Sequence, residues 1–545
     1  MLGPAPRLTD KVSSIRGRCQ RSSPNWREVL PSVINGSVED SAVAVTMAGP
    51  GQTVTFGELE SRSRQLARLL RSRGLGEGSH LAVLLDNHPH YLEACWAAQR
   101  SGLFYTPINW HLGGEEAGYI VSDCEATALV TTARLAPLVE AIRPQLARVV
   151  TRLVLDGELE GFEDYEAALA ASPGEPLAHE TEGAFMFYSS GTTGRPKGIQ
   201  PPLRAAPFGT GGPLDLLVKG IYGFRPGMVY LCPAPLYHAA PIGWSMATQR
   251  SGGTVVVMER FDPEAALAAI ERHRVTHVQF VPTHFIRMLK LDPRVRESYD
   301  LSSLEVVVHA AAPCPVEVKR QMLDWLGPIV YEYYSGSEGI GFCAVGPHEW
   351  LERPGTVGRS MIGTPHIVGE DGHELGAEVG QIWFETPARF EYHNDPDRTA
   401  AVFDEHGWGT LGDVGYLDVD GYLFLTDRVS HMIISGGVNI YPQEIEDALI
   451  MHPGVADAAV IGAPDAEMGE SVLAVIQPAD PSGDHAALSE ELRAFCRERL
   501  AGFKCPRSYR FTDALPRLPT GKLLKRRLRD ELGGSSAGSV VGGAS

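Results

Sequence analysis

One stretch of the chain gathers the side chains that could hold a polyphosphate. Between Tyr188 and Gly198 the sequence places five hydroxyl groups, three glycines, one arginine and one lysine. Glycines let the backbone approach a ligand and turn its N–H groups inward, hydroxyls donate to phosphate oxygens, and the cations neutralise charge. The stretch is not a Walker A loop, because Lys197 is followed by glycine rather than by Ser or Thr. We therefore predict a phosphate cradle of another kind, with an exposed polar turn as the alternative.

The elements that must position this cradle alternate between strands and helices. A strand at 184–188 is predicted to lead into it. Before it, strands at 81–85, 104–108, 127–131 and 149–155 alternate with helices at 56–73 and 91–100, and a second series begins at 229. This order is typical of parallel sheets covered on both faces. Short alternating runs after Pro354 indicate an antiparallel sheet or small barrel, and the pattern after 428 indicates a separate small α+β domain.

The composition limits the classes of function. The 545 residues include 48 Lys and Arg against 67 Asp and Glu, a formal net charge of −19, with 43% hydrophobic and 21% charged residues. This profile is typical of a soluble globular protein and argues against a general nucleic-acid binder, which needs a basic surface. No apolar run is long enough for a membrane span. None of the eight cysteines forms a Cys-x-x-Cys pair, so we expect a reducing, cytoplasmic location.

The two ends of the chain differ in composition from the rest. Residues 1–27 are basic and lack the apolar block of a secretory signal, so we predict a disordered extension, with a transit segment as the alternative. Residues 533–545 contain only Gly, Ser, Ala and Val, and we predict a disordered tail. Between them we expect a large domain at 28–428 and a small mobile domain at 429–532.

Five stretches resemble, in family order, motifs of the adenylate-forming superfamily, which includes acyl-CoA synthetases, luciferases and the adenylation domains of peptide synthetases. They are the 188–198 stretch, Tyr-Ser-Gly-Ser-Glu at 334–338, Trp-Gly-Thr-Leu-Gly-Asp at 408–413, the stretch at 427–446, and Leu-Pro-Arg-Leu-Pro-Thr-Gly-Lys at 515–522. The resemblance implies an α/β fold with a large N-terminal domain of two doubly wound βα subdomains and a small β-barrel-like subdomain. A small mobile α+β C-terminal domain would follow.

The resemblance also implies a two-step reaction. A carboxylic acid and ATP would give an acyl-adenylate and pyrophosphate, and CoA would then attack to give acyl-CoA and AMP. Two anions must meet in the first step, so positioning and preorganised positive charge should dominate catalysis. The family places Lys522 between the carboxylate and the α-phosphate, and in its acyl-CoA synthetases the C-terminal domain swings between the steps. Ser430 would be the hinge, where many relatives carry Asp or Lys.

The implied site residues fall into groups. The catalytic set is Lys522, Glu338, Thr193 and Lys197, with Glu338 and Thr193 holding Mg²⁺ through oxygen. The ATP-binding set is Ser189, Ser190, Gly191, Thr192, Thr193, Gly194, Lys197, Ala311, Ala312, Pro313, Tyr334, Ser335, Gly336, Ser337, Asp413 and Arg428. The acyl pocket and its gate would comprise His238, Gly243, Trp244, Val307 and Ala310. CoA would contact Gly436, Gly437 and Lys504.

The substrate is predicted to be a hydrophobic acid. An amino-acid-activating relative would carry an aspartate near Tyr237 to pair with the ammonium group, and none is present. The small residues Ala310 and Ala311 leave room for an alkyl chain or a ring, and a medium- or long-chain fatty acid is favoured. The alternatives are an aromatic or alicyclic acid, transfer of the adenylate to a carrier protein, and a non-catalytic acyl or nucleotide sensor. The only feature that favours a sensor is Ser430, which differs from the Asp or Lys of many relatives. The sequence leaves the oligomeric state, including a homodimer, open.

Overall fold

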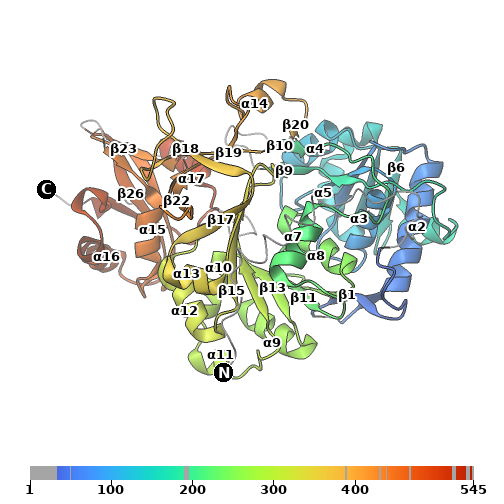
Figure 1. Ribbon diagram of the computed structural model, residues 1–545, viewed down its shortest axis with the longest axis horizontal. Helices are drawn as coiled ribbons and strands as arrows, with labels where there is room; N and C mark the ends of the chain where they lie inside the picture. The colour runs from blue at the N-terminus through green and yellow to red at the C-terminus, as the bar shows by residue number, and fades with distance from the viewer. Residues whose placement is uncertain are drawn as a thin grey trace.

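The computed structural model describes residues 34–49, 51–189, 196–386, 390–428, 431–436, 438–465, 468–517, 523–534 and 541–542. In Figure 1 the chain runs from a first subdomain at the right, through a central sheet, to the C-terminal domain at the left. The expected extension at 1–27 lies outside the described residues, as does most of the tail. The domain limits therefore remain predictions.

The first subdomain is a parallel α/β sheet, as the alternation predicted. Its strand order is β7 (Glu163–Asp164), β6 (Thr151–Leu155), β5 (Ala128–Thr132), β3 (His80–Leu84), β4 (Phe104–Pro107) and β8 (Ala184–Phe185). The α-helices of this part are α2 (Phe56–Ser72), α3 (Tyr91–Arg100), α4 (Gly114–Asp123), α5 (Ala136–Ala141) and α6 (Tyr165–Ala170). Thr55 begins α2 with a capping box, because its hydroxyl accepts from the Glu58 N–H while the Glu58 carboxylate accepts from the Thr55 N–H.

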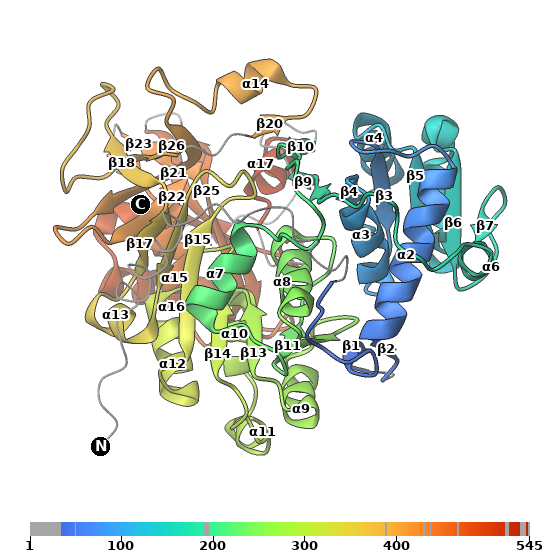
Figure 2. The ribbon, with the colours of Figure 1, turned by 45° about the vertical axis from the view of Figure 1, so that its right-hand side comes forward.

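The second subdomain is built on one half of a larger sheet, whose strands are parallel except for the edge strand at 53–55, which pairs antiparallel with its neighbour. Its strands are, in spatial order, β2 (Thr53–Thr55), β1 (Val43–Met47), β12 (Thr254–Val257), β11 (Val229–Cys232), β13 (His277–Phe280), β14 (Val306–His309) and β15 (Val330–Ser335). Figure 2 shows α7 (Pro213–Tyr222) and α8 (Ala239–Arg250) in front of this sheet. The hydrophobic core on the other face includes residues of α9 (Pro263–His273), α10 (Pro282–Leu289) and α12 (Val316–Leu326). The short helices α11 (Pro293–Glu297) and α13 (Pro347–Glu352) follow in the chain.

The expected antiparallel part continues this sheet directly. Strand β16 (Phe342–Val345) pairs antiparallel with β15, and β17 (Thr356–Ile362), β22 (Leu423–Arg428), β21 (Gly409–Leu417), β19 (Gly380–Glu385) and β18 (Thr364–Val368) extend the order. The described strands of this subdomain therefore form one end of a thirteen-stranded sheet. The short helix α14 (Pro396–Ala400) lies above it in Figure 1.

The prediction of a single strand at 184–188 is wrong in one respect. The structure divides it into β8, which belongs to the first subdomain, and β9 (Phe187–Ser189), which pairs with β10 (Lys197–Gln200) in a separate small sheet completed by β20 (Glu391–Tyr392). Met186 lies between them and is fully buried. The predicted cradle thus begins on a strand that has already left the large sheet.

The C-terminal domain is α+β, as expected. Its sheet has the order β24 (Val438–Ile440), β23 (Ile433–Ser435), β26 (Gly469–Pro478), β27 (Ser508–Phe511) and β28 (Val541–Gly542), and β25 (Val455–Asp465) also pairs with β26. Its helices are α15 (Pro442–Ile450), α16 (His485–Arg499) and α17 (Lys525–Gly534). A separate hydrophobic core packs between α15, α16 and this sheet.

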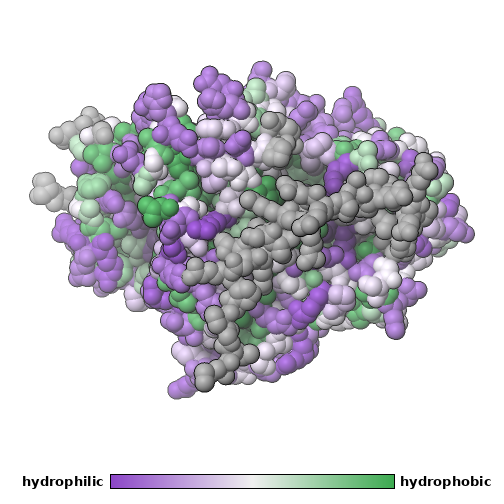
Figure 3. All heavy atoms as spheres, in the orientation of Figure 1, coloured by the Kyte–Doolittle hydropathy of each residue, from purple (hydrophilic) through white to green (hydrophobic). Residues whose placement is uncertain are grey.

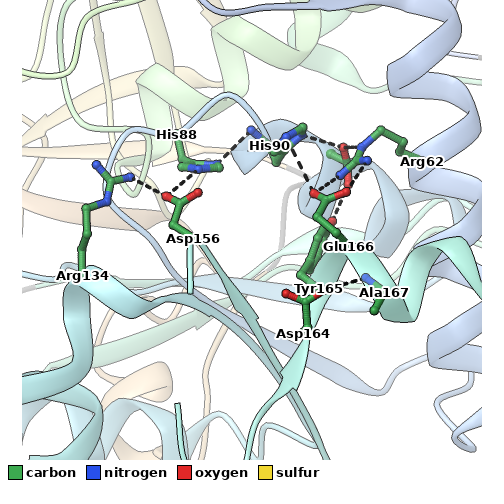
Figure 4. Close-up of polar contacts among 10 residues, drawn as sticks. Arg62, His88, His90, Arg134, Asp156, Asp164, Tyr165, Glu166 and Ala167 are labelled. Carbon is green, nitrogen blue, oxygen red and sulfur yellow. Dashed lines mark hydrogen bonds and ion pairs between the residues drawn. The ribbon is translucent and has the colours of Figure 1, made fainter. Parts of the chain in front are cut away.

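A network of buried charge holds the helices of the first subdomain together. Glu93 on α3 is fully buried and accepts from Arg62 Nε at 2.6 Å and from the Tyr165 hydroxyl at 2.5 Å. The Arg62 guanidinium also contacts both oxygens of Glu166, and His90 lies 3.0 Å from Glu93. Figure 4 shows these side chains converging from α2, α3 and α6. The pairing compensates the charge of a carboxylate that would otherwise be costly to bury.

Asn87 joins the two parallel sheets. It follows β3, it is 7% exposed, and its amide nitrogen donates to the carbonyls of Met258 at 2.6 Å and Ala234 at 3.3 Å. Its carbonyl oxygen accepts from the Leu236 N–H at 2.8 Å. These partners follow β12 and β11 of the larger sheet, whereas Asn87 follows β3 of the first sheet. One side chain from the first sheet therefore satisfies backbone groups at the carboxyl ends of two strands of the second.

We expect Asn87→Ala to lower the free energy of unfolding by about 3 kcal/mol, because three buried backbone groups lose the side-chain hydrogen bonds that Asn87 makes with them. Denaturant unfolding followed by tryptophan fluorescence measures the difference. Asn439→Ala, at an exposed position of β24, is the matched control and should change stability little. Equal stability of the two variants would show that Asn87 does not hold the subdomains together.

Candidate active site

A cavity of about 1760 Å³ opens between the large domain and the C-terminal domain. It is lined by residues from the small β9–β10–β20 sheet, the ends of the parallel strands, the antiparallel strands β21 and β22, and helices α15 and α17. Most of the described residues that the motifs assigned to ATP line it, namely Ser189, Lys197, Ala311, Ala312, Pro313, Tyr334, Ser335, Gly336, Ser337, Asp413 and Arg428. Stretches far apart in the sequence therefore meet around one space.

Asp413 is the centre of the best-defined polar contacts in the cavity. Its carboxylate accepts from the Tyr334 hydroxyl at 2.6 Å and from Arg428 Nε at 2.8 Å, and the residue is 7% exposed. Asp413 and Arg428 are directly opposite in the β21–β22 ladder, so the sheet register fixes this ion pair. Burial and the Asp413 charge raise the pKa of Tyr334, while the Asp413 charge raises the pKa of Arg428. At neutral pH the tyrosine thus stays protonated and the arginine stays charged.

A second set of contacts connects Lys197 with Glu338. The Lys197 ammonium lies 5.0 Å from the centre of the Tyr392 ring, and the Tyr392 hydroxyl donates to Glu338 Oε1 at 3.0 Å. Burial lowers the pKa of Lys197, with the charge of Arg398 adding to the effect. The motifs did not point to Tyr392, because β20 matches none of them. Its place opposite Ile199 on β10 brings it to the site.

The loop after β15 is held in a tight conformation beside the Asp413 group. The Ser335 hydroxyl donates to the Gly341 carbonyl at 2.7 Å. A side chain at Gly336 would place its Cβ 2.5 Å from the Leu411 side chain, which would have to move to make room for it. Across the cavity, Ala311 has a φ of 74°, a left-handed conformation that is uncommon for a residue other than glycine. Ala311 turns the chain after β14 and places Ala312 and Pro313 on the cavity wall.

Several predicted residues lie outside the described part of the chain: Ser190, Gly191, Thr192, Thr193, Gly194, Ser430, Gly437 and Lys522. Their surroundings are partly described. Ser189 and Lys197, which flank the predicted cradle, are cross-strand partners, so the ends of the cradle lie side by side. Arg517 and Leu523, which flank the Lys522 segment, form an isolated antiparallel bridge and both line the cavity. The roles of the residues between these ends remain predictions.

The C-terminal domain contributes a charged wall. Lys525 is paired with Glu446 at 2.8 Å, and both are buried. Asp427 accepts from the Gln443 N–H at 3.1 Å and lies 3.4 Å from His431. Each of these residues lines the cavity.

Asp447, also on this wall, has no ion-pair partner among the described residues. Its carboxylate accepts only from the Gln443 side-chain amide, at 2.7 Å. Burial raises the pKa of Asp447 to about 7, and the neighbouring Glu446 charge adds to the shift.

The residues predicted for the acyl pocket lie partly on the cavity wall and partly in the protein core. His238 and Trp244 line the cavity, whereas Gly243 and Ala310 are buried and do not line it. The assignment of Val307 is wrong, because its side chain packs in the core formed with α9, α10 and α12. Alternation along β14 turns Val306 and Val308 to the other core instead.

Gly436 and Lys504 are the residues of the predicted CoA set that the structure describes, and neither borders the cavity. Lys504 is paired with Glu444 at 2.5 Å. Gly436 has a φ of 58° at the turn of the β23–β24 hairpin, whose Ile434 and Val438 are 50% and 45% exposed. Figure 3 shows hydrophobic surface over the C-terminal domain on this side of the molecule.

Within the described ranges no group of three or more His, Cys, Asp or Glu side chains has the arrangement of a metal site, so the magnesium prediction depends on Glu338, Thr193 and phosphate oxygens. In the same part of the chain, the structure contains no helix with the length and apolar character needed to span a membrane.

Comparison with known proteins gives consistent matches along the chain. The family model described as AMP-binding enzyme matches residues 35–391, and the model described as AMP-binding enzyme C-terminal domain matches 444–522. A feruloyl-CoA synthase of Amycolatopsis sp is 36% identical over 488 residues, covering 89% of this chain and 95% of the relative. A fatty acid–[acyl-carrier-protein] ligase of Streptomyces coeruleorubidus is 32% identical over 501 residues, covering 90% and 94%. The structure of an amide bond synthetase from Marinactinospora thermotolerans superposes with a TM-score of 0.75 at 30% identity, covering 91% and 97%.

The raised pKa of Asp447 predicts a pH dependence of stability. An aspartate in the unfolded chain ionises near pH 4, whereas Asp447 in the folded protein holds its proton up to about 7. Between these values the folded state binds more protons than the unfolded state, so the contribution of Asp447 to stability falls as pH rises. We expect the melting temperature of the wild type, relative to Asp447→Asn, to decrease from pH 5 to pH 8.

Thermal unfolding of both proteins across this range is the measurement. Asp513→Asn, at an exposed position after β27, serves as the control, and its difference from the wild type should stay constant. A difference between wild type and Asp447→Asn that does not change with pH would contradict the buried, protonated state of Asp447.

Proposed function

We propose, from the premise that the chain belongs to the AMP-binding enzyme family, that it activates a hydrophobic carboxylic acid with ATP and transfers the acyl group to CoA. The chain is an AMP-forming acyl-CoA synthetase, and the proposal concerns its substrate, its metal and the roles of its residues. The supporting observation is the convergence of Lys197, Glu338 and the Tyr334–Asp413–Arg428 group on one cavity.

The Asp413 group would bind the nucleoside. A carboxylate oxygen can accept more than one hydrogen bond, so Asp413 can keep Tyr334 and Arg428 and still accept from ribose hydroxyls. The Tyr334 ring would lie against one face of adenine, with Ala312 and Pro313 on the opposite wall. In this arrangement the ion pair fixed by the sheet register positions the sugar, and the sugar positions the phosphates.

The phosphate end would be held by Lys197 and the cradle before it. Lys197 is charged and half-buried, so its attraction to phosphate is less screened than that of a surface lysine. Glu338 offers a carboxylate oxygen, a ligand that Mg²⁺ prefers, and the Tyr392 hydroxyl fixes the direction of that carboxylate. When bound, Mg²⁺ would neutralise charge on the phosphates. The described residues fit this assignment, and Thr193 would complete it.

In the first step the acid carboxylate would attack the α-phosphate, forming the acyl–phosphate bond while the bond to pyrophosphate breaks. Lys522 would lie between the two anions and reduce their repulsion. The flanking residues Arg517, Leu523 and Lys525 line the cavity, which supports this position for the lysine in the arrangement seen here.

In the second step the CoA thiolate would attack the acyl carbon, and AMP would leave. Gly436 and Lys504 are away from the cavity, so this step would require the C-terminal domain to turn about a hinge at Ser430. The exposed apolar hairpin that carries Gly436 would then close against the large domain. Many relatives carry Asp or Lys where this chain has Ser430. Because serine tolerates turn conformations, the difference would affect the rate of the domain rotation and would not forbid it.

The acyl group and the acceptor are the finer parts of the proposal. A fatty acid and an aromatic acid both fit a hydrophobic cavity, and the named relatives include a feruloyl-CoA synthase and a fatty acid ligase that uses a carrier protein. We propose CoA as the acceptor, because the relative with the highest identity among those reported above is named a feruloyl-CoA synthase. Pyrophosphate release from ATP and Mg²⁺ with a panel of acids, followed with and without CoA, tests the reaction. Release without a CoA thioester would indicate a carrier protein, and no release with any acid would refute the proposal.

We expect Lys522→Ala to separate the two steps. Adenylation should fall by at least about 10²-fold, because the positive charge between the two anions is lost. Thioester formation from preformed acyl-adenylate should survive, because the lysine leaves the site when the domain turns. Single-turnover assays of each half-reaction make the measurement, with Lys219→Ala on the exposed face of α7 as the control. Equal loss in both half-reactions would contradict the two-conformation mechanism.

Asp413→Asn is expected to raise KM for ATP by about 10-fold or more, since the charge-assisted bond to Arg428 and the acceptor for ribose are both weakened. Tyr334→Phe is the matched comparison, because it removes one hydrogen bond to Asp413 but keeps the carboxylate and the ring. Its effect on KM should be smaller. Pyrophosphate release measured as a function of ATP concentration gives the KM of each variant. An unchanged KM for ATP in Asp413→Asn would place the nucleoside elsewhere.

A further inference from the structure

An aromatic stack forms one wall of the cavity between the parallel sheet and α8. The Tyr333 ring lies nearly parallel to Trp244, at 5.9 Å and 16°, and to Phe342, at 5.2 Å and 13°. The three side chains come from β15, α8 and β16, and each lines the cavity. Trp244 is 2% exposed and Phe342 is 7% exposed, so the stack is packed rather than loose. The part of the stack that borders the cavity is aromatic, and an aromatic ligand group can pack against such rings in an offset or edge-to-face arrangement.

A single buried amide interrupts this apolar surface. Gln279 on β13 lines the same cavity, is 7% exposed, and has its Nε2 atom 2.7 Å from the Tyr333 hydroxyl. Its Oε1 atom is buried and has no hydrogen-bond partner among the described residues. A buried polar atom without a partner costs about 1–3 kcal/mol. The amide therefore has one end held by the aromatic stack and one end in need of a partner.

The chemistry of that partner follows from the two ends of the amide. If the oxygen faces Tyr333 instead, the free end is the NH₂ group, which donates rather than accepts. A hydroxyl group satisfies either orientation, because it both donates and accepts. A saturated alkyl chain satisfies neither and leaves the amide unpaired. A ring without a polar substituent fits the stack but has the same defect.

We propose that the acid activated by this enzyme is an aromatic carboxylic acid whose ring carries a hydroxyl group that hydrogen-bonds Gln279. The proposal rests on the proposed function and names its substrate class. Gln279 is then a specificity-determining residue for the reaction, and Tyr333 is the residue that positions its amide. The aromatic alternative is thereby favoured over a fatty acid, a choice that the small residues Ala310 and Ala311 leave open because they make room for an alkyl chain or a ring.

The test uses the wild-type enzyme and matched acids. We would measure kcat/KM for pyrophosphate release with 4-hydroxycinnamate against cinnamate, with 4-hydroxybenzoate against benzoate, and with decanoate. At least one hydroxylated acid should exceed its plain partner by about 10-fold or more, because a site built to bind a hydroxyl leaves buried groups unpaired with the analogue that lacks it. Decanoate should be the poorer substrate. Equal values within both pairs, or decanoate as the best substrate, would overturn the proposal.

The Gln279→Leu variant tests whether Gln279 causes the preference for the hydroxylated acid. The variant should lose the preference within the pair, mainly through a fall in kcat/KM for the hydroxylated acid, while the value for the plain acid is kept or rises. Gln321→Leu on α12, whose amide contacts Glu317, is the control and should keep the wild-type ratio. Tyr333→Phe keeps the ring and removes only the hydroxyl that holds the amide, so it should narrow the ratio without abolishing activity on the plain acid. A wild-type ratio in Gln279→Leu would refute the role of Gln279.

The wild-type panel remains informative if a variant fails to fold. Release of pyrophosphate with some acid but no preference for a hydroxyl would leave the proposed function intact and refute only the substrate class. No release with any acid would refute the proposed function itself.

Discussion

The structure depends on the contacts of one buried carboxylate, that of Asp413. It receives Tyr334 from the loop after the parallel strands and Arg428 from the neighbouring antiparallel strand. Arg428 is also the last described residue before the segment that leads into the C-terminal domain. Its N–H donates to Asp427, whose other oxygen accepts from the N–H of Gln443 on α15. A continuous set of polar contacts thus connects the nucleoside position with the first helix of the C-terminal domain.

The described contacts between the two domains are of a kind that can be exchanged. Lys290 at the end of α10 donates to the carbonyls of Val455 and Ala456, at 2.9 and 3.1 Å. The C-terminal wall of the cavity carries the charged residues Glu446, Asp447 and Lys525. The C-terminal domain has its own hydrophobic core, so it does not need the large domain to bury its apolar residues. Polar contacts between domains with separate cores permit relative motion, which is what a two-step reaction in one cavity requires.

Much of the fold follows from local patterns in the sequence. Helix α3 has the predicted bounds, because its apolar pattern is uninterrupted, and the capping box at Thr55 fixes the start of α2. The motif residues could also be assigned to one site, because their spacing is tied to a known chemistry. The failures have physical reasons. The run at 184–188 is apolar throughout, so its pattern does not show that the chain changes sheets at Met186.

Some residues of the site could not be found or placed from the sequence, and these errors have a different cause. Val307 was assigned to the acyl pocket by its position beside a motif, but a period of two fixes only that neighbours face opposite ways, not which face borders the cavity. Tyr392 and Gln279 belong to no motif, and each acquires its role from a cross-strand or inter-element contact. Hydrophobic pockets discriminate weakly between ligands that differ in size, whereas one buried polar group discriminates strongly between ligands that can and cannot satisfy it. In our proposal, substrate identity therefore depends least on the residues whose motifs indicate the reaction and most on Gln279, a polar side chain that the fold brings to the cavity.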